Sequence, residues 1–223
     1  RTVIVYGMAL GGMNFLFYMS LRSVPLGIAV ALEFTGALAV AIYASRRAIV
    51  FLWIALAAVG LLLLIPTGAT AQGIDLLGAG YALGAGVCWA LYILFGQKAG
   101  ADNGVQTAAL GVVIAALFVA PIGIVHAGAA LLTPSLIPIA IGVAILSTAL
   151  PYTLEMVALT RMPAKTFGTL MSIEPAVGAL SGLLFLHEFL SLSQWMAILC
   201  IILASVGATM TMGSAAKPAV AAD

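Results

Sequence analysis

Charged residues are scarce in this sequence. Asp, Glu, Lys and Arg make up 7% of its 223 residues, against about 25% in soluble domains. Eight basic and seven acidic residues leave a net charge of +1, which provides no basic surface of the kind that binds nucleic acid. Hydrophobic residues account for 64%, and the mean hydropathy is +1.25. The composition therefore predicts an integral membrane protein rather than a soluble enzyme.

Residue patterns that several kinds of chemistry require are also missing. The two cysteines, Cys88 and Cys200, lie in apolar runs, so we expect neither a disulfide framework nor a metal site. The segment 178–182 has the wrong spacing for an intramembrane serine protease, whose nucleophile lies in Gly-x-Ser-Gly. No P-loop for ATP is present. We therefore predict a protein that is not an enzyme, holds no cofactor and takes any energy it uses from an ion gradient.

Long apolar stretches dominate the chain instead. A helix that crosses about 30 Å of hydrocarbon needs about 20 mostly apolar residues. Eight stretches come close to this length: about 2–20, 25–45, 49–66, 76–96, 105–126, 136–158, 163–186 and 191–212. The joining segments are short and leave no room for a separate soluble domain. We therefore predict an all-α polytopic membrane protein with eight transmembrane helices in this chain.

The basic residues are distributed unevenly between the two ends of these spans. If residue 1 is cytoplasmic, seven of the eight basic residues fall on the cytoplasmic side and Arg22 falls opposite. Cytoplasmic segments of membrane proteins carry such an excess of Lys and Arg. The distribution therefore predicts that both ends of the chain are cytoplasmic. The seven are Arg1, Arg46, Arg47, Lys98, Arg161, Lys165 and Lys217.

Two parts of the sequence resemble each other weakly. When residues 16–25 are set over 154–163, two leucines and a proline coincide, and a shift of three residues places Glu33 over Glu174. So few identities also arise by chance in an apolar sequence. The matched spans are five apart, however, so equivalent helices would cross the membrane in opposite directions. That arrangement is an inverted repeat, which is common in transporters that bind substrate near the membrane midplane.

Three glutamates fall within the predicted spans. Glu33 and Glu174 lie near the middle of their spans, and Glu155 lies toward the cytoplasmic end of its span. A charge inside a bilayer costs about 2.5–3.5 kcal/mol on insertion scales, so each is a candidate functional group. One interpretation is that each carboxyl is protonated or hydrogen-bonded and holds helices together. The other is that it takes up protons or binds an ammonium group during transport.

Further polar side chains repeat at helical spacing and predict either a cavity lining or helix–helix contacts. The candidates for a binding site are Asn14 and Tyr18 in span 2–20, Trp89 and Tyr92 in span 76–96, and Thr148 and Tyr152, followed by Glu155, in span 136–158.

Several strings in the sequence are more specific than general hydrophobicity. They are residues 7–18, 24–36, 82–94, 144–152 and 166–176. These strings resemble those of bacterial threonine/homoserine exporters, in the EamA-type branch of the drug/metabolite transporter superfamily. The resemblance implies ten helices in two inverted five-helix repeats, a multi-pass location in the bacterial inner membrane and cytoplasmic termini. It also implies export of small amino acids driven by the proton gradient, so that the expected partners are the amino acid, protons and the lipid bilayer.

The resemblance also predicts how the chain is divided. Residues 1–66 would be the last three helices of the first repeat, residues 76–212 the complete second repeat and residues 213–223 a cytoplasmic tail, so that the first two helices of the family are expected to be missing. Two other functions stay open: an EamA-type exporter of another metabolite or drug, and a non-transporting scaffold or partner subunit. The intramembrane glutamates favour transport, because a scaffold has no reason to bury a carboxyl twice.

Overall fold

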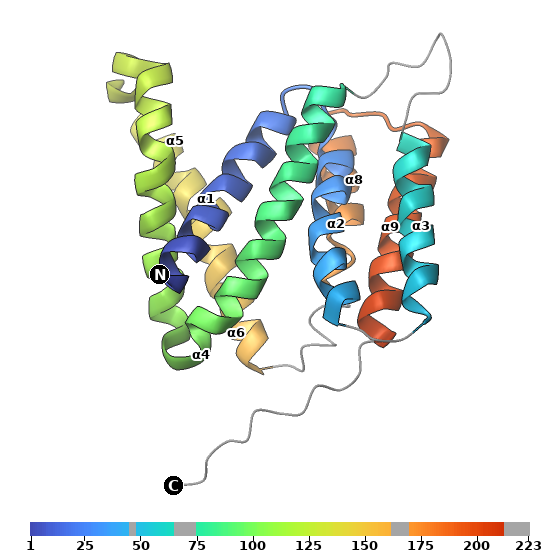
Figure 1. Cartoon of the computed structure of the whole chain (residues 1–223). Coiled ribbons are helices and arrows are strands. Elements are labelled where there is room, and N and C mark those ends of the chain that lie inside the picture. Colours follow the sequence, from blue (N-terminus) through green and yellow to red (C-terminus); the bar gives the residue numbers. More distant parts are fainter. Residues whose placement is uncertain (45–47, 65–74, 162–169, 212–223) are drawn as a thin grey trace, which may run out of the picture.

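The chain forms a bundle of helices. Figure 1 presents a computed structural model, which describes residues 1–44, 48–64, 75–161 and 170–211. Within these ranges every regular element is a helix, which confirms the predicted all-helical class. The elements are α1 (Thr2–Ser20), α2 (Leu26–Ala44), α3 (Val50–Leu64), α4 (Leu76–Ala127), η1 (Gly128–Leu132), α5 (Leu136–Val143), η2 (Ala144–Ala149), α6 (Leu150–Arg161), α8 (Glu174–Phe185) and α9 (Leu192–Thr211). Arg46, Arg47, Lys165, Lys217 and the predicted tail lie outside the described residues.

Helix α4 differs from the two separate spans predicted from the sequence. Its 52 residues are continuously helical, with no loop between the predicted spans 76–96 and 105–126. Figure 1 shows that the helix bends sharply and that its two arms run in opposite directions on either side of α1. The apolar parts of the arms are Leu76–Gly96 and Gln106–Leu131. Thus α4 has the path of two membrane spans although its backbone stays helical through the bend.

Other predicted spans also correspond to helical segments, with some changes at their ends. Among the described residues, five helical stretches are long and apolar enough to cross a membrane, and three shorter helices are also apolar. The predicted span 136–158 consists of α5, the π-helical turn η2 and α6. The predicted span 163–186 is described only from residue 170, and its helix α8 begins at Glu174. The number of membrane crossings therefore stays a prediction.

Helix α2 lies at the centre of the bundle, between α4, α8 and α9 (Figure 1). Its Ile28, Ala29, Ala31 and Phe34 side chains are fully or almost fully buried. A Cβ atom on Gly36 would overlap the backbone of Gly86 in α4, so the two helices touch through their main chains. Such close packing is characteristic of membrane helices, whose association relies on van der Waals contact between small residues.

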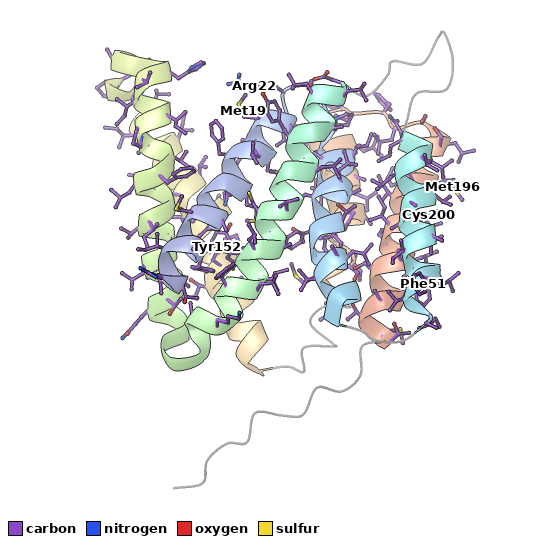
Figure 2. All side chains as sticks on the ribbon, in the orientation of Figure 1. Met19, Arg22, Phe51, Tyr152, Met196 and Cys200 are labelled. Atoms are coloured by element: carbon purple, nitrogen blue, oxygen red, sulfur yellow. The ribbon has the colours of Figure 1, made fainter. Side chains whose placement is uncertain are left out.

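The outer surface of the bundle is strongly apolar. Phe51 in α3 is 74% exposed, and Leu117 and Val125 in the second arm of α4 are 70% and 88% exposed. Figure 2 shows Phe51 and Met196 on the outer side of the α3–α9 pair. A surface with so many large exposed hydrophobic side chains fits lipid rather than water. The fold is therefore that of a multi-pass membrane protein.

Two carboxylates fasten the segment between α1 and α2. Asp75 begins α4, where it accepts hydrogen bonds from the Leu77 and Gly78 amides and from the Ser23 hydroxyl, the last over 2.7 Å. The Ser23 hydrogen bond, followed by the two amide bonds, lowers the pKa of Asp75. Glu188, in the segment between α8 and α9, accepts a 2.8 Å hydrogen bond from the Leu26 amide at the start of α2. These contacts fix the start of α2, the helix that carries Glu33.

Candidate functional site

A cavity of about 840 Å³ opens between α1, α2, the first arm of α4, η2, α6 and α8. Its lining comes from segments far apart in the sequence, which helical packing brings to one place. Its volume is large enough for a small organic molecule. Eight of the nine candidate side chains predicted from the sequence line it: Asn14, Tyr18, Glu33, Trp89, Tyr92, Tyr152, Glu155 and Glu174.

The three glutamates enter the cavity from different helices: Glu33 from α2, Glu155 from α6 and Glu174 from the first position of α8. Glu174 interacts electrostatically with each of the other two. In the described part of the chain, none of the three carboxyls has a hydrogen bond or an ion pair. No basic side chain is among the described residues that line the cavity. The contacts expected of carboxyls that only join helices are therefore absent from the described residues.

Two hydrogen-bonded pairs connect α1 to the opposite wall of the cavity. The Asn14 amide donates 3.0 Å hydrogen bonds to the Leu10 carbonyl one turn earlier and to the Tyr152 hydroxyl in α6. The hydroxyls of Tyr18 and Ser147 are 3.0 Å apart, and either can be the donor. Figure 2 shows Tyr152 beside α1, well inside the bundle. The polar face of α1 predicted from the sequence therefore faces the cavity.

Aromatic side chains form much of the remaining wall. Trp89 packs edge to face against Phe34 of α2, with ring centroids 5.1 Å apart. Tyr92 stacks on the buried Tyr6 at 5.0 Å and lies 6.4 Å from the ring of Tyr152. Aromatic faces attract ammonium groups, and tyrosine and tryptophan also supply hydrogen-bond donors. The cavity thus combines acidic groups with aromatic surfaces.

Thr148 is the predicted residue that does not line the cavity; its neighbour Ser147 takes that place. Regular α-helical spacing puts Thr148, four residues before Tyr152, on the same face as Tyr152. The turn η2 is a π-helix, in which hydrogen bonds join residues five apart instead of four, so the turn is wider than that of an α-helix. The wider turn brings Ser147 into line with Tyr152 instead. Sequence reasoning missed Ser147 because it assumed one uniform helical period, although Pro151 was a signal of a disturbed helix.

Glu174 also differs in its local setting from the middle of a continuous helix. Ser172 and Ile173 form a turn, and α8 begins at Glu174 with Pro175 in its first turn. Proline fits there because the first amides of a helix have no intrahelical acceptor. The Ser172 hydroxyl lies 2.8 Å from that of Ser205 in α9, which fastens the turn to the bundle. Pro175 thus accompanies the start of α8 after this turn, and α8 carries Glu174 into the cavity lining.

Comparison with known proteins assigns this chain to a family. The profile of the EamA-like transporter family matches residues 76–210, more than half of the chain. The chain belongs to the EamA-like transporter family. The cavity therefore lies in a transporter fold, and the EamA-type resemblance found in the sequence is confirmed.

Individual members of the EamA-like family are close to this chain over nearly its whole length. The threonine/homoserine exporter RhtA of Escherichia coli (strain K12) is 57% identical over 215 residues, which cover 96% of this chain and 73% of that protein. RhtA of Salmonella typhimurium (strain LT2) is 57% identical over 210 residues, covering 94% of this chain and 71% of that protein. The predicted resemblance to threonine/homoserine exporters is confirmed by these matches. No solved structure matches the chain.

Proposed function

We propose that this protein exports small amino acids of the threonine and homoserine type across the bacterial inner membrane, driven by the proton gradient. The observation that carries the proposal is the group of three cavity carboxyls, Glu33, Glu155 and Glu174, without a partner in the described residues. Carboxyls of this kind are free to bind a proton or an ammonium group. The 57% identity to exporters of threonine and homoserine supports the choice of cargo.

Competition between a proton and the ammonium group of the cargo for one carboxyl gives a simple mechanism for exchanging protons with amino acids. An ionised Glu33 or Glu174 pairs with the ammonium group of the amino acid that enters from the cytoplasm. When the carboxyl takes up a proton from the outer side, it loses its charge and the ammonium group leaves. Return of the proton to the cytoplasm restores the carboxylate for the next amino acid. One proton therefore moves inward for each cargo released by that carboxyl, and the gradient drives export.

The other lining residues have supporting roles in this proposal. The amide of Asn14 and the hydroxyls of Tyr152 and Tyr18 provide hydrogen bonds for the polar groups of the cargo, and Thr148, which lies beside this lining, has no direct role. Trp89 and Tyr92 present aromatic faces to its ammonium group. These residues bind and orient the cargo, while the carboxyls couple its movement to protons.

The architecture that we propose is two inverted five-helix repeats, with residues 1–66 in the first repeat and 76–212 in the second. The positions of three basic residues support cytoplasmic ends. The bend of α4, which contains Lys98, lies at the same end of the bundle as the N-terminus, whereas Arg22 lies at the opposite end (Figure 2). Cytoplasmic ends would place both Arg1 and Lys98 on the side where basic residues are enriched.

The test is uptake of labelled threonine into inside-out membrane vesicles that contain the full-length protein. With an imposed proton gradient, we expect uptake by the wild type and at least a tenfold lower rate for Glu33→Gln and Glu174→Gln. Glutamine keeps the shape of the side chain but does not titrate. Glu188→Gln is the matched control, because Glu188 lies outside the cavity lining and glutamine still offers an acceptor to the Leu26 amide.

Three outcomes would contradict the proposal. If both cavity variants reach the membrane at normal levels and concentrate threonine with unchanged pH dependence, Glu33 and Glu174 have only structural roles. If the wild type carries neither threonine nor homoserine but protects cells against unrelated toxic compounds, the cargo is another metabolite or drug. Absence of any transport would instead favour a scaffold.

A further inference from the structure

The π-helical turn η2 is a local irregularity within a predicted membrane span. In an α-helix the amide of residue 151 would donate to the carbonyl of Ser147, but Pro151 has no amide hydrogen and its ring would clash with that carbonyl. The turn widens at this point, and the Leu150 amide donates to the Ile145 carbonyl five residues earlier. π-helical turns of this kind often occur at functional sites.

The widened turn brings a pair of hydroxyls to the cavity wall. Ser147 lies 3.0 Å from the Tyr18 hydroxyl, and both residues line the cavity. Tyr18 is 51% exposed, so the pair is accessible to a molecule in the cavity. Each hydroxyl has one donor and two acceptor positions. A single hydrogen bond between them leaves one donor and several acceptor positions available for a third hydroxyl.

The hydroxyl pair shares the cavity with Glu33, which lies on the neighbouring helix α2. Tyr18 is two residues from the end of α1, and Glu33 is seven residues from the start of α2 at the same end of the bundle. With a rise of about 1.5 Å per residue, the two positions differ in depth by roughly 7 Å. Both side chains extend from these backbone positions into the same cavity, where one bound molecule can reach them.

We propose that Ser147 and Tyr18 bind the side-chain hydroxyl of the cargo and so select hydroxy amino acids over their deoxy analogues. This inference rests on the function proposed above, in which Glu33 holds the ammonium group. The ammonium end then lies at Glu33, and the hydroxyl end completes the network that Ser147 and Tyr18 begin. A deoxy cargo would leave this hydroxyl pair without its third member, and sites that bind a substrate hydroxyl discriminate strongly against analogues that lack it.

The experiment compares two cargoes in inside-out vesicles: threonine and 2-aminobutyrate, which is threonine without its hydroxyl. For the wild type we expect at least a tenfold lower KM for threonine than for 2-aminobutyrate. In Tyr18→Phe and Ser147→Ala, the KM for threonine should rise about tenfold while that for 2-aminobutyrate stays the same. Ser147→Thr keeps a hydroxyl and should restore the preference. Thr148→Val is the matched control, because Thr148 lies beside Ser147 but does not line the cavity.

The outcomes separate this inference from the proposed function. If the wild type carries threonine and 2-aminobutyrate equally well, the inference is overturned while threonine transport stands. If both variants lose transport of the two cargoes to the same extent, the pair only ties α1 to η2, which also overturns it. If the wild type carries neither threonine nor homoserine, the proposed function fails and the inference fails with it. Because Tyr18→Phe changes a different helix and keeps the ring, it still provides the test if Ser147→Ala does not reach the membrane.

Discussion

The side-chain amide of Asn14 and the hydroxyl of Tyr152 are 3.0 Å apart although 138 residues separate them in the chain. They also occupy matching positions in the weak internal repeat, because each stands two residues before an aligned leucine, Leu16 or Leu154. In an assembly of two units related by a two-fold axis, a contact between equivalent positions lies at the axis. In the two-repeat architecture proposed here, this hydrogen bond marks the axis, and it lies in the wall of the cavity.

A pair of cysteines tests this relationship. If the repeats rock about the axis, positions 14 and 152 should stay at nearly the same distance. In protein without Cys88 and Cys200, a short bifunctional thiol reagent should cross-link Asn14→Cys to Tyr152→Cys with yields that agree within about twofold, with or without cargo and a proton gradient. The comparison is the pair Tyr18→Cys and Ser147→Cys, which lies off the proposed axis. Its cross-linking yield should change more when cargo and a proton gradient are added. If the cross-linking yield changed more for positions 14 and 152 than for positions 18 and 147, the hydrogen bond between Asn14 and Tyr152 would not mark the axis.

The contact between Gly36 and Gly86 predicts a stability effect. A methyl group on Gly36 would overlap the Gly86 backbone, so α2 and α4 must move apart in Gly36→Ala. Overpacking of this kind costs about 1–3 kcal/mol. We expect the free energy of unfolding in mixed detergent micelles to fall by that amount. Gly80→Ala is the control, since no heavy atom lies within 4 Å of its added methyl group, and it should be unchanged or slightly more stable. Equal effects at both positions would contradict the packing argument.

The hydrogen-bonded carboxylate of Asp75 should make the stability of the protein depend on pH. Hydrogen bonds from Ser23, Gly78 and Leu77 lower its pKa in the folded protein, so the ionised carboxylate stabilises the fold above the ordinary pKa of an aspartate. That contribution is lost as the pH falls through the lowered pKa. Asp75→Asn cannot titrate at this position. We therefore expect the melting temperature of the wild type to fall more steeply than that of Asp75→Asn between about pH 6 and about pH 3. If the melting temperatures of the wild type and Asp75→Asn fell in parallel with pH, the Asp75 carboxylate would not contribute to stability.

Membrane orientation is open to direct labelling. In protein without Cys88 and Cys200, a membrane-impermeant maleimide added to intact cells should modify Arg22→Cys and leave Lys98→Cys unmodified. The reason is that the two residues lie at opposite ends of the bundle, and the proposed orientation places the end that carries Lys98 in the cytoplasm. Permeabilised cells are the control, in which both positions should react. The reverse pattern in intact cells would overturn the proposed cytoplasmic termini.

The sequence by itself determined the class of protein and most of the candidate residues. A bilayer requires long apolar segments with internally satisfied backbones, so composition and segment length predict membrane helices such as α1 and α9 closely. The cost of an intramembrane charge drew attention to Glu33, Glu155 and Glu174 before their surroundings were known. The inference of helices succeeds because it depends on local composition and on the solvent, whereas the role of the three glutamates stays a prediction.

Only the tertiary structure decided which side chains share a site and which have partners. The pairs Asn14–Tyr152 and Tyr18–Ser147 join α1 to α6 and η2, and no local pattern specifies contacts over such distances in sequence. The choice of Ser147 over Thr148 depends on a single widened turn, which shifts the face of a helix by one residue. The contact of Glu188 with α2 likewise depends on how α8 and α9 pack. Helical periodicity describes one helix at a time, whereas the cavity is formed by the packing of several.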